Sequence, residues 1–266
     1  MELGTVEDTL FVPLLGRIYA SKNHSNILFD AKALELERKI PERIRDNDRQ
    51  KQYTLIASAS RSANMDRYID AFLSENPEGV IVELGVGLES TFYRKKKTPK
   101  AWYGVDLDNV ITYRKNLLGE EGIKLISGDA FSEAWIKAVK NENPASKILV
   151  TCSGLFYYFS NEKVCSLLKK LHEAGDFQIV FDAVNKSGMK MMKKAYMKQV
   201  GHADAEVFFY VDKGNSLVKE IGNGCALLSE EPFYKHIDRR GLKAGTKFNM
   251  VASDILKMVK MIHLSL

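Results

Sequence analysis

The hydrophobic positions of this chain follow two patterns, which change near residue 79. Before that point, apolar residues recur at helical spacing across residues 34–44 and again across residues 56–73. After it, short apolar runs typical of buried strands occur at 80–84, 101–106, 123–127, 147–152 and 177–183. The pattern therefore predicts a helical N-terminal region followed by a region that contains a sheet.

Helical segments at about 132–140 and 161–174 separate the later apolar runs. Strands that alternate with helices indicate a parallel sheet covered on both faces. Further β-like runs near the C-terminal end are expected to add a strand or two at 206–211, 225–230 and 258–265. The predicted fold class is α/β, with a doubly wound and mostly parallel sheet.

We predict two regions that together form one structural unit. We expect residues 1–78 to form an N-terminal helical cap that packs over the ligand site, because an all-helical region of this size is too large for a tail. Residues 79–266 are expected to form the sheet domain. The chain of 266 residues is long enough to bury a large core.

Composition narrows the class of protein. The net charge of +5 is spread along the chain, and the longest basic run, 95–97, has no interleaved aromatic residues, so no nucleic-acid partner is expected. Three distant cysteines show neither a zinc pattern nor a disulfide framework. No apolar stretch approaches the about 20 residues of a membrane span, and the N-terminus does not read as a signal peptide. We expect a cytoplasmic protein without a membrane partner.

The segment 80–106 is the most informative part of the sequence. It reads as a strand, a glycine turn, a crossover and a second strand, which together form a nucleoside-binding unit. Gly85 and Gly87 permit positive φ and the close approach of a ligand to the backbone. Asp106 ends the second strand about 20 residues later, a spacing that suits a carboxylate bound to ribose hydroxyls. A glycine turn without a ligand is the structural alternative.

The residues around the glycines distinguish two classes of cofactor. Dinucleotide loops carry a third glycine, but Ser90 occupies that position here, and two acids, Glu83 and Glu89, flank the turn. Carboxylates beside a pyrophosphate repel it, whereas S-adenosylmethionine has no phosphate and presents a sulfonium and an ammonium group. The pattern favours a class I methyltransferase. Alternatively, Glu83 only organises the loop by accepting backbone N–H bonds.

Polar residues also follow the third and fourth predicted strands. Asp129 and Ala130 could hydrogen-bond the adenine amino group, although Asp129 could equally be an acid at a helix N-terminus. Ser153 follows the fourth strand at the topological switch point, where a residue can face both cofactor and acceptor. Tyr157 and Tyr158 lie beside it and are predicted to orient the acceptor, with core packing as the alternative.

Taken together, these segments resemble the leucine carboxyl methyltransferase family, and most closely its bacterial branch of polyketide O-methyltransferases of the tetracenomycin type. The order and spacing of the matching segments carry the resemblance, which extends over nearly the whole chain. The segments are residues 11–17, 28–30, 61 with 66–73, 83–94, 105–107, 154–155 with 158, and 180–182.

The resemblance implies a Rossmann-like methyltransferase sheet under an N-terminal helical cap, which uses S-adenosylmethionine and releases S-adenosylhomocysteine. It implies that Arg61 binds the cofactor's carboxylate, a task suited to a bidentate guanidinium. Without the resemblance, a solvated helix-surface arginine would be expected there. It further implies that Gly85 belongs to the cofactor loop, that Asp106 binds the ribose, and that Asp129 and Ala130 contact adenine.

Two more positions follow from the resemblance. Arg17 matches a recurrent arginine near the mouth of the site and is predicted to lie on the substrate side. Ser153 departs from the family, which usually has glutamate there, and a serine cannot supply that charge. Glu89 stands where the family often has aspartate, which is a milder change.

The expected reaction is an in-line methyl transfer, for which the protein must align the reactants and exclude water. No metal is expected. A carboxylate acceptor needs no base, whereas a hydroxyl acceptor benefits from one. We expect an O-methyltransferase that acts on a small-molecule, polyketide-like hydroxyl or carboxyl acceptor. The alternatives are methylation of a protein's C-terminal leucine carboxylate and, suggested by Ser153, a cofactor-binding protein without catalysis.

Overall fold

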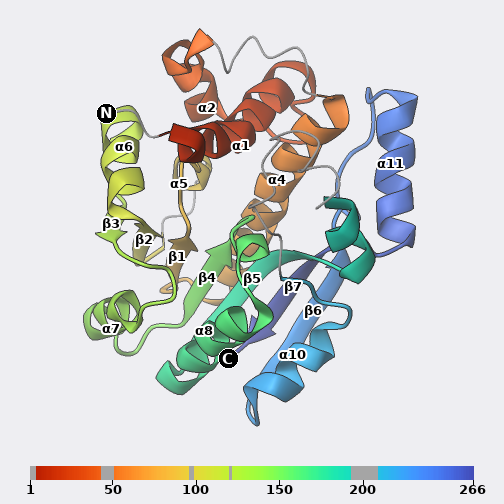
Figure 1. The fold of residues 1–266 in the computed structure, drawn as a ribbon. Coiled ribbons are helices and arrows are strands. Elements are labelled where there is room, and N and C mark those ends of the chain that lie inside the picture. The colour runs from red at the N-terminus through yellow and green to blue at the C-terminus, as the bar shows by residue number, and fades with distance from the viewer. Residues whose placement is uncertain (1–3, 43–50, 96–98, 120–121, 193–208) are drawn as a thin grey trace.

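The computed structural model describes residues 4–42, 51–95, 99–119, 122–192 and 209–266. Within these residues, seven strands form one sheet in the order β3-β2-β1-β4-β5-β7-β6 (Figure 1). The strands are β1 (Val80–Leu84), β2 (Ala101–Asp106), β3 (Lys124–Ser127), β4 (Ile148–Cys152), β5 (Phe177–Val184), β6 (Ala226–Pro232) and β7 (Val259–Ser265). The pairs among β1 to β5 are parallel, and β7 is antiparallel to both neighbours. The predicted mostly parallel, doubly wound sheet is confirmed.

The helices of the described residues alternate with the parallel strands as expected. They are α1 (Gly4–Asn23), α2 (Ala31–Leu36), the 3₁₀ helix η1 (Glu37–Lys39), α4 (Gln52–Glu75), α5 (Thr91–Arg94), α6 (Asp108–Leu118), α7 (Glu133–Glu142), the 3₁₀ helix η2 (Phe156–Tyr158), α8 (Asn161–Ala174), α10 (Gly214–Ile221) and α11 (Ala244–Ile255). Side chains of Asp30, Ser132 and Ser160 accept backbone N–H bonds at the start of α2, α7 and α8. These caps satisfy donors that a helix leaves open at its N-terminus. None of these helices is long and apolar enough to span a membrane.

Alternation along β1 decides which way its residues point. Val80, Val82 and Leu84 belong to the core on the face covered by α7, α8 and α10. Ile81 belongs to the core on the opposite face, under α4 and α11. Because successive strand residues point to opposite faces, Glu83 lies on the α4 side. The side chain of Glu83 is thus buried between the sheet and α4.

The helix α4 connects the N-terminal helices to the sheet. Its residues Ile69, Phe72 and Leu73 are buried in the same core as Ile81, and α1 packs along it. Figure 1 shows α1 and α2 at the end of the sheet where the parallel strands terminate. The helix α4 therefore contributes both to the predicted cap and to the layer that covers the sheet. The division between residues 1–78 and 79–266 stays a prediction.

Of the three β-like runs near the C-terminal end, one is not a strand over its described residues. In the run 206–211, residues 206–208 lie outside the described residues, and residues 209–211 do not form a strand. Phe209 and Val211 are buried in the core beside α8 and α10, and Val211 N–H donates to the Val184 carbonyl at 2.8 Å. Phe209 and Val211 are apolar because this part of the connection crosses the core. The other two C-terminal runs are confirmed as β6 and β7.

Candidate cofactor site

The glycine loop follows β1 directly and has the backbone that only glycine adopts readily. Gly85 has φ +69° and Gly87 has φ +44°, both in the left-handed region. A Cβ at Gly85 would lie 3.0 Å from the Leu155 side chain, and one at Gly87 would lie 3.2 Å from Leu10. Neighbouring segments approach the loop so closely that both positions have little room for a side chain.

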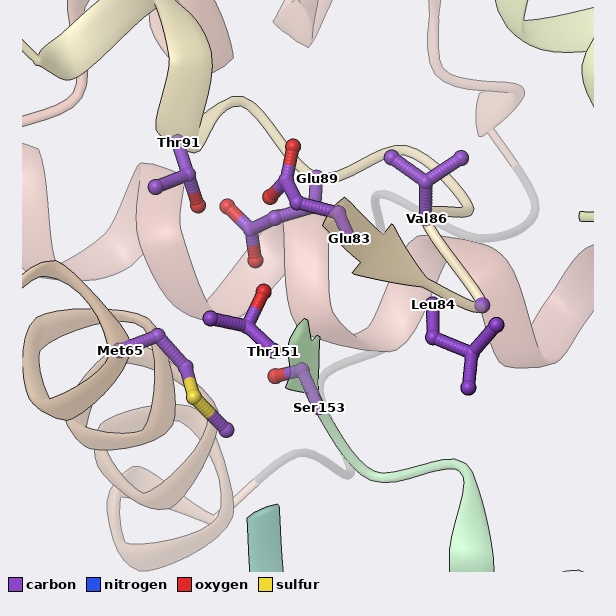
Figure 2. Close-up of a pocket in the computed structure, with 9 residues that line it drawn as sticks. Met65, Glu83, Leu84, Val86, Glu89, Thr91, Thr151 and Ser153 are labelled. Carbon is purple, nitrogen blue, oxygen red and sulfur yellow. The ribbon is translucent and has the colours of Figure 1, made fainter. Parts of the chain in front are cut away.

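A small cavity of about 10 Å³, about the space of one water molecule, lies beside this loop, between β1, β4 and α4 (Figure 2). Its lining residues are Met65, Glu83, Leu84, Gly85, Val86, Glu89, Thr91, Thr151 and Ser153. Figure 2 shows the carboxyl groups of Glu83 and Glu89 next to each other. Among the described residues that line it, none is basic. The residues that line this cavity therefore offer two carboxyl groups and no partner for a phosphate.

Glu83 is the acid of this pocket whose ionisation changes near neutral pH. Its side chain is buried, and Trp102 Nε1 donates a hydrogen bond to its Oε2 at 2.9 Å. Burial raises the pKa of Glu83 to about 7, and the nearby Glu89 carboxylate adds to the rise. A cation bound in the pocket would favour the ionised form and lower this pKa.

Glu89 differs from Glu83 because protein cations neutralise it. Arg17 Nη1 and Arg94 Nη1 donate to its two carboxylate oxygens at 3.1 and 3.0 Å, and Ser62 Oγ donates at 2.9 Å. Burial alone would raise the pKa of Glu89, but the charges of Arg17 and Arg94 hold it well below its ordinary value. Of the two acids, Glu83 is therefore the one available to a cationic ligand.

Arg17 is buried behind the glycine loop. Its Nη2 donates to the Leu88 carbonyl at 2.6 Å, and its Nε lies 3.2 Å from Asp30 Oδ2. Arg94 Nη1 donates to the same Asp30 oxygen at 2.6 Å. Arg17, Asp30, Glu89 and Arg94 thus form a buried ion network that ties α1 and the start of α2 to the loop and α5.

The ion network contains Arg17, for which a place was predicted, and Asp30 and Arg94, for which no role was predicted. Arg17 does not line the pocket, and its predicted place on the substrate side stays a prediction. Sequence reasoning gave no role to Asp30 or Arg94. The only signal for them was their position inside the segments 28–30 and 83–94 that carry the family resemblance.

The other predicted nucleoside contacts lie at the ends of β2 and β3. Asp106 Oδ2 accepts the Gly87 N–H and Oδ1 accepts the Leu107 N–H, both at 2.8 Å. This carboxylate holds the glycine loop in place, and burial raises its pKa. Each oxygen retains a lone pair for a further donor, so ribose binding fits the geometry and stays a prediction.

The residues after β3 are held by local hydrogen bonds. Asp129 is exposed, and its Oδ1 accepts the Phe131 N–H at 2.9 Å, just before α7 begins. The Ala130 carbonyl accepts the Trp135 indole N–H at 2.9 Å. Asp129 thus shapes a turn three residues before Ser132, which is the residue that caps α7. Adenine contact by Asp129 and Ala130 stays a prediction.

The predicted residues Arg61, Tyr157 and the Ser153 loop come together around Asp182, which sequence reasoning did not single out. Arg61 Nε donates to Asp182 Oδ2 at 2.7 Å, and Tyr157 Oη donates to the same oxygen at 2.8 Å. Arg61 is thus held in place and is not a solvated surface arginine. Tyr157 is buried, whereas Tyr158 is 46% exposed. Ser153 lines the pocket.

Comparison with known proteins identifies the family. Residues 9–172 match the model of the leucine carboxyl methyltransferase family. This chain belongs to that family. It is 28% identical over 190 residues to the tetracenomycin polyketide synthesis O-methyltransferase TcmP of Streptomyces glaucescens, covering 69% of this chain and 68% of that protein.

Solved structures confirm the fold of this leucine carboxyl methyltransferase family member. A DUF574 family protein from Streptomyces avermitilis matches with a TM-score of 0.58 at 12% identity, covering 94% of this chain and 96% of that one. An S-adenosylmethionine-dependent methyltransferase from Anabaena variabilis matches with a TM-score of 0.51 at 11% identity, covering 77% and 86%. The sheet is that of a class I methyltransferase.

The site fits the cofactor of this family. The positive φ values of Gly85 and Gly87 let a ligand approach the backbone, and Asp106 stands at the end of the neighbouring strand. The pocket offers an ionisable carboxyl group, Glu83, and no described basic group to a phosphate. The protein is an S-adenosylmethionine-dependent methyltransferase, as the acids beside the loop predict.

Proposed function

We propose that this methyltransferase transfers the methyl group to an oxygen of a small-molecule, polyketide-like acceptor, either a hydroxyl or a carboxyl group. The observation that carries the proposal is the similarity to TcmP over 69% of the chain, since that relative is named as a polyketide O-methyltransferase. The exposed Tyr158 beside the end of β4 gives such an acceptor a polar contact.

The chain's own residues supply binding and orientation. S-adenosylmethionine brings a methyl group that is already activated by the sulfonium. Glu83 would face its cationic groups, Arg61 its carboxylate, Asp106 its ribose, and Asp129 with Ala130 its adenine. Each of these contacts places the nucleoside at the carboxyl ends of the strands, where the glycine loop approaches it.

The two tyrosines after β4 would contribute differently. Burial, with the nearby Asp182 carboxylate, raises the pKa of Tyr157 well above its ordinary value, so its hydroxyl stays protonated and donates to Asp182. Tyr157 would therefore hold Asp182 and the loop after β4 in place, and its predicted part in orienting the acceptor would act through this loop. Tyr158, being exposed, can meet an acceptor directly. A carboxylate acceptor needs no base, and for a phenol the deprotonated acceptor would be favoured at higher pH.

The test is to incubate the protein with S-adenosylmethionine and a matched set of aromatic phenols and aromatic carboxylic acids. S-adenosylhomocysteine and the methylated product are measured by mass spectrometry. Support for the proposal is a product with the methyl on oxygen, and mild base separates an ester, which it cleaves, from an ether. The Gly85→Ala variant serves as the control for background methylation.

The family model supports a second candidate, methylation of the C-terminal leucine carboxylate of a protein. A leucine-ended peptide and the same peptide with an amidated terminus distinguish the two. A base-labile methyl ester on the free peptide alone, with no small molecule methylated, would replace the proposal by this candidate. Product from any acceptor excludes a cofactor-binding protein without catalysis, the alternative that Ser153 suggested.

A further inference from the structure

Asp182 lies in β5, between β4 and β7 of the described sheet, and is 1% exposed. Its carboxylate receives three hydrogen bonds from two other segments. Gly154 N–H donates to Oδ1 at 2.7 Å, Arg61 Nε donates to Oδ2 at 2.7 Å, and Tyr157 Oη donates to Oδ2 at 2.8 Å. The buried acid therefore joins β5, the loop after β4 and the helix α4.

This contact fixes how the guanidinium of Arg61 is presented. Asp182 binds the Nε edge, and the Arg61 side chain remains 23% exposed. Nη1 lies against Gly154, where an added Cβ would be only 3.1 Å away. Met65, one helical turn further along α4, lines the acid pocket beside the glycine loop, so Arg61 lies on the pocket side of the helix. The terminal nitrogens of Arg61 are thus directed along the loop after β4.

We infer that Asp182 is a positioning residue for cofactor binding, which holds Arg61 through Nε so that the terminal nitrogens of Arg61 bind the carboxylate of S-adenosylmethionine. The inference rests on the proposed contact between Arg61 and that carboxylate. It extends that contact to a residue that touches no ligand itself. A guanidinium held in one orientation loses less conformational freedom when it binds a carboxylate.

The charge of Asp182 is essential to this role. An asparagine in its place can still accept the Gly154 N–H, but it no longer neutralises Arg61. Depending on its orientation, the amide group presents either N–H donors or a weaker neutral acceptor to Arg61 Nε and Tyr157 Oη. Without that carboxylate, the Arg61 guanidinium is expected to be more stable when it turns toward water than when it stays against Gly154.

The experiment compares two ligands by calorimetric titration. S-adenosylhomocysteine carries the amino-acid carboxylate, and 5′-methylthioadenosine has the same nucleoside and sulfur but lacks the whole amino-acid end, both its carboxylate and its ammonium group. Asp182→Asn is expected to weaken S-adenosylhomocysteine by about 10- to 100-fold, the range for a charge-assisted hydrogen bond, and 5′-methylthioadenosine by less than about threefold. Arg61→Ala should show the same selectivity. The double variant should bind no more weakly than Arg61→Ala alone, because both changes remove one interaction.

A matched control is Glu230→Gln, which also replaces an acid by its amide. Glu230 Oε1 accepts from the buried Lys260 at 2.6 Å, in the same sheet. It is expected to lower stability without changing the ratio of the two affinities. A second variant, Arg61→Lys, covers the case in which Asp182→Asn does not fold. Lysine keeps the charge but lacks the Nε contact, so Arg61→Lys should weaken S-adenosylhomocysteine selectively, as Arg61→Ala does.

Three results would overturn the inference. Equal weakening of both ligands by Asp182→Asn would show a structural role only. Selective weakening by Arg61→Ala with none by Asp182→Asn or Arg61→Lys would show that Arg61 needs no positioning. No selectivity in Arg61→Ala would place the carboxylate elsewhere. None of these titrations includes an acceptor, so failure here is separate from failure of the proposed O-methylation.

Discussion

Trp102 donates its indole N–H to the buried carboxyl group of Glu83 at 2.9 Å, across the neighbouring strands β1 and β2. This hydrogen bond favours the ionised acid, yet burial outweighs it and raises the pKa of Glu83 to about 7. The acid next to the glycine loop is therefore close to its midpoint of ionisation at neutral pH. Its protonation should respond both to folding and to a bound cation.

The first prediction concerns stability. In the unfolded chain Glu83 ionises near its ordinary pKa of 4.5, and in the folded protein near 7. Between these values the folded state holds a proton that the unfolded state has lost, so the free energy of unfolding falls as pH rises, by about 3 kcal/mol from this group. In Glu83→Gln this fall is expected to be missing. Urea unfolding of both proteins at pH 4.5 and pH 8 measures it. An identical fall in both would show that other groups cause it.

The second prediction concerns ligand binding. A cation in the pocket lowers the pKa of Glu83, so binding S-adenosylmethionine at pH 7 should release about half a proton from this group. Calorimetry in two buffers with different ionisation enthalpies measures the release. Glu83→Gln should release about half a proton less. Protons released by the ligand's own amine are the same for both proteins and cancel in this comparison. Equal release by the two proteins would mean that the cation does not sense Glu83.

The third prediction concerns the glycine loop. Gly85→Ala forces a left-handed φ on alanine, which costs about 1–2 kcal/mol, and puts a methyl group 3.0 Å from Leu155. Gly175→Ala is the matched control, because Gly175 has the same φ of +69° and no atom within 4 Å of its added Cβ. Both should unfold at lower urea concentration, and only Gly85→Ala should also lose affinity for S-adenosylhomocysteine. A loss shared by both would indicate a general effect of instability.

The fourth prediction concerns the buried ion network. Arg94→Met leaves the carboxylates of Asp30 and Asp66 without this cation and should lower the free energy of unfolding by about 3–5 kcal/mol. Lys147→Met, which removes a cation from the exposed pair with Asp176, should cost under about 1 kcal/mol. Chemical denaturation of the two variants compares them. Similar small costs would show that the network contributes little to stability.

The fifth prediction concerns Asp106. If its carboxylate binds the ribose, Asp106→Asn should weaken S-adenosylhomocysteine and 5′-methylthioadenosine alike, by about 10- to 100-fold, because both contain the ribose. This differs from the selective loss expected for Arg61→Ala and is measured in the same titrations. Weakening of neither ligand would leave Asp106 only the role of holding the Gly87 N–H.

Much of the fold was predictable because the central parallel strands are buried on both faces and therefore read as continuous apolar runs. This holds for β1, where all five residues are buried, and for β4. The run 206–211 was misleading for the same reason: Phe209 and Val211 are as buried as strand residues but belong to a connection. Hydrophobicity reports burial, and a short run does not distinguish a strand from another buried segment.

The sequence by itself determined the local chemistry of the cofactor loop. Gly85, Gly87 and the flanking acids are close in sequence, and their backbone freedom and charge favour a cationic nucleoside cofactor over a dinucleotide. Only the tertiary structure decided which acid is available. Arg17 from α1 neutralises Glu89, and Trp102 and burial leave Glu83 near its midpoint.

The pairing of Arg61 with Asp182 likewise joins residues 121 positions apart. Sequence patterns follow the repeat of a helix or strand, over a few residues, and carry no information on which distant charges meet. That is decided when α4 packs on the sheet and desolvates both groups, because a buried charge must find a partner. The cofactor class is therefore readable from one loop, whereas the pairing of Arg61 with Asp182 depends on the whole fold.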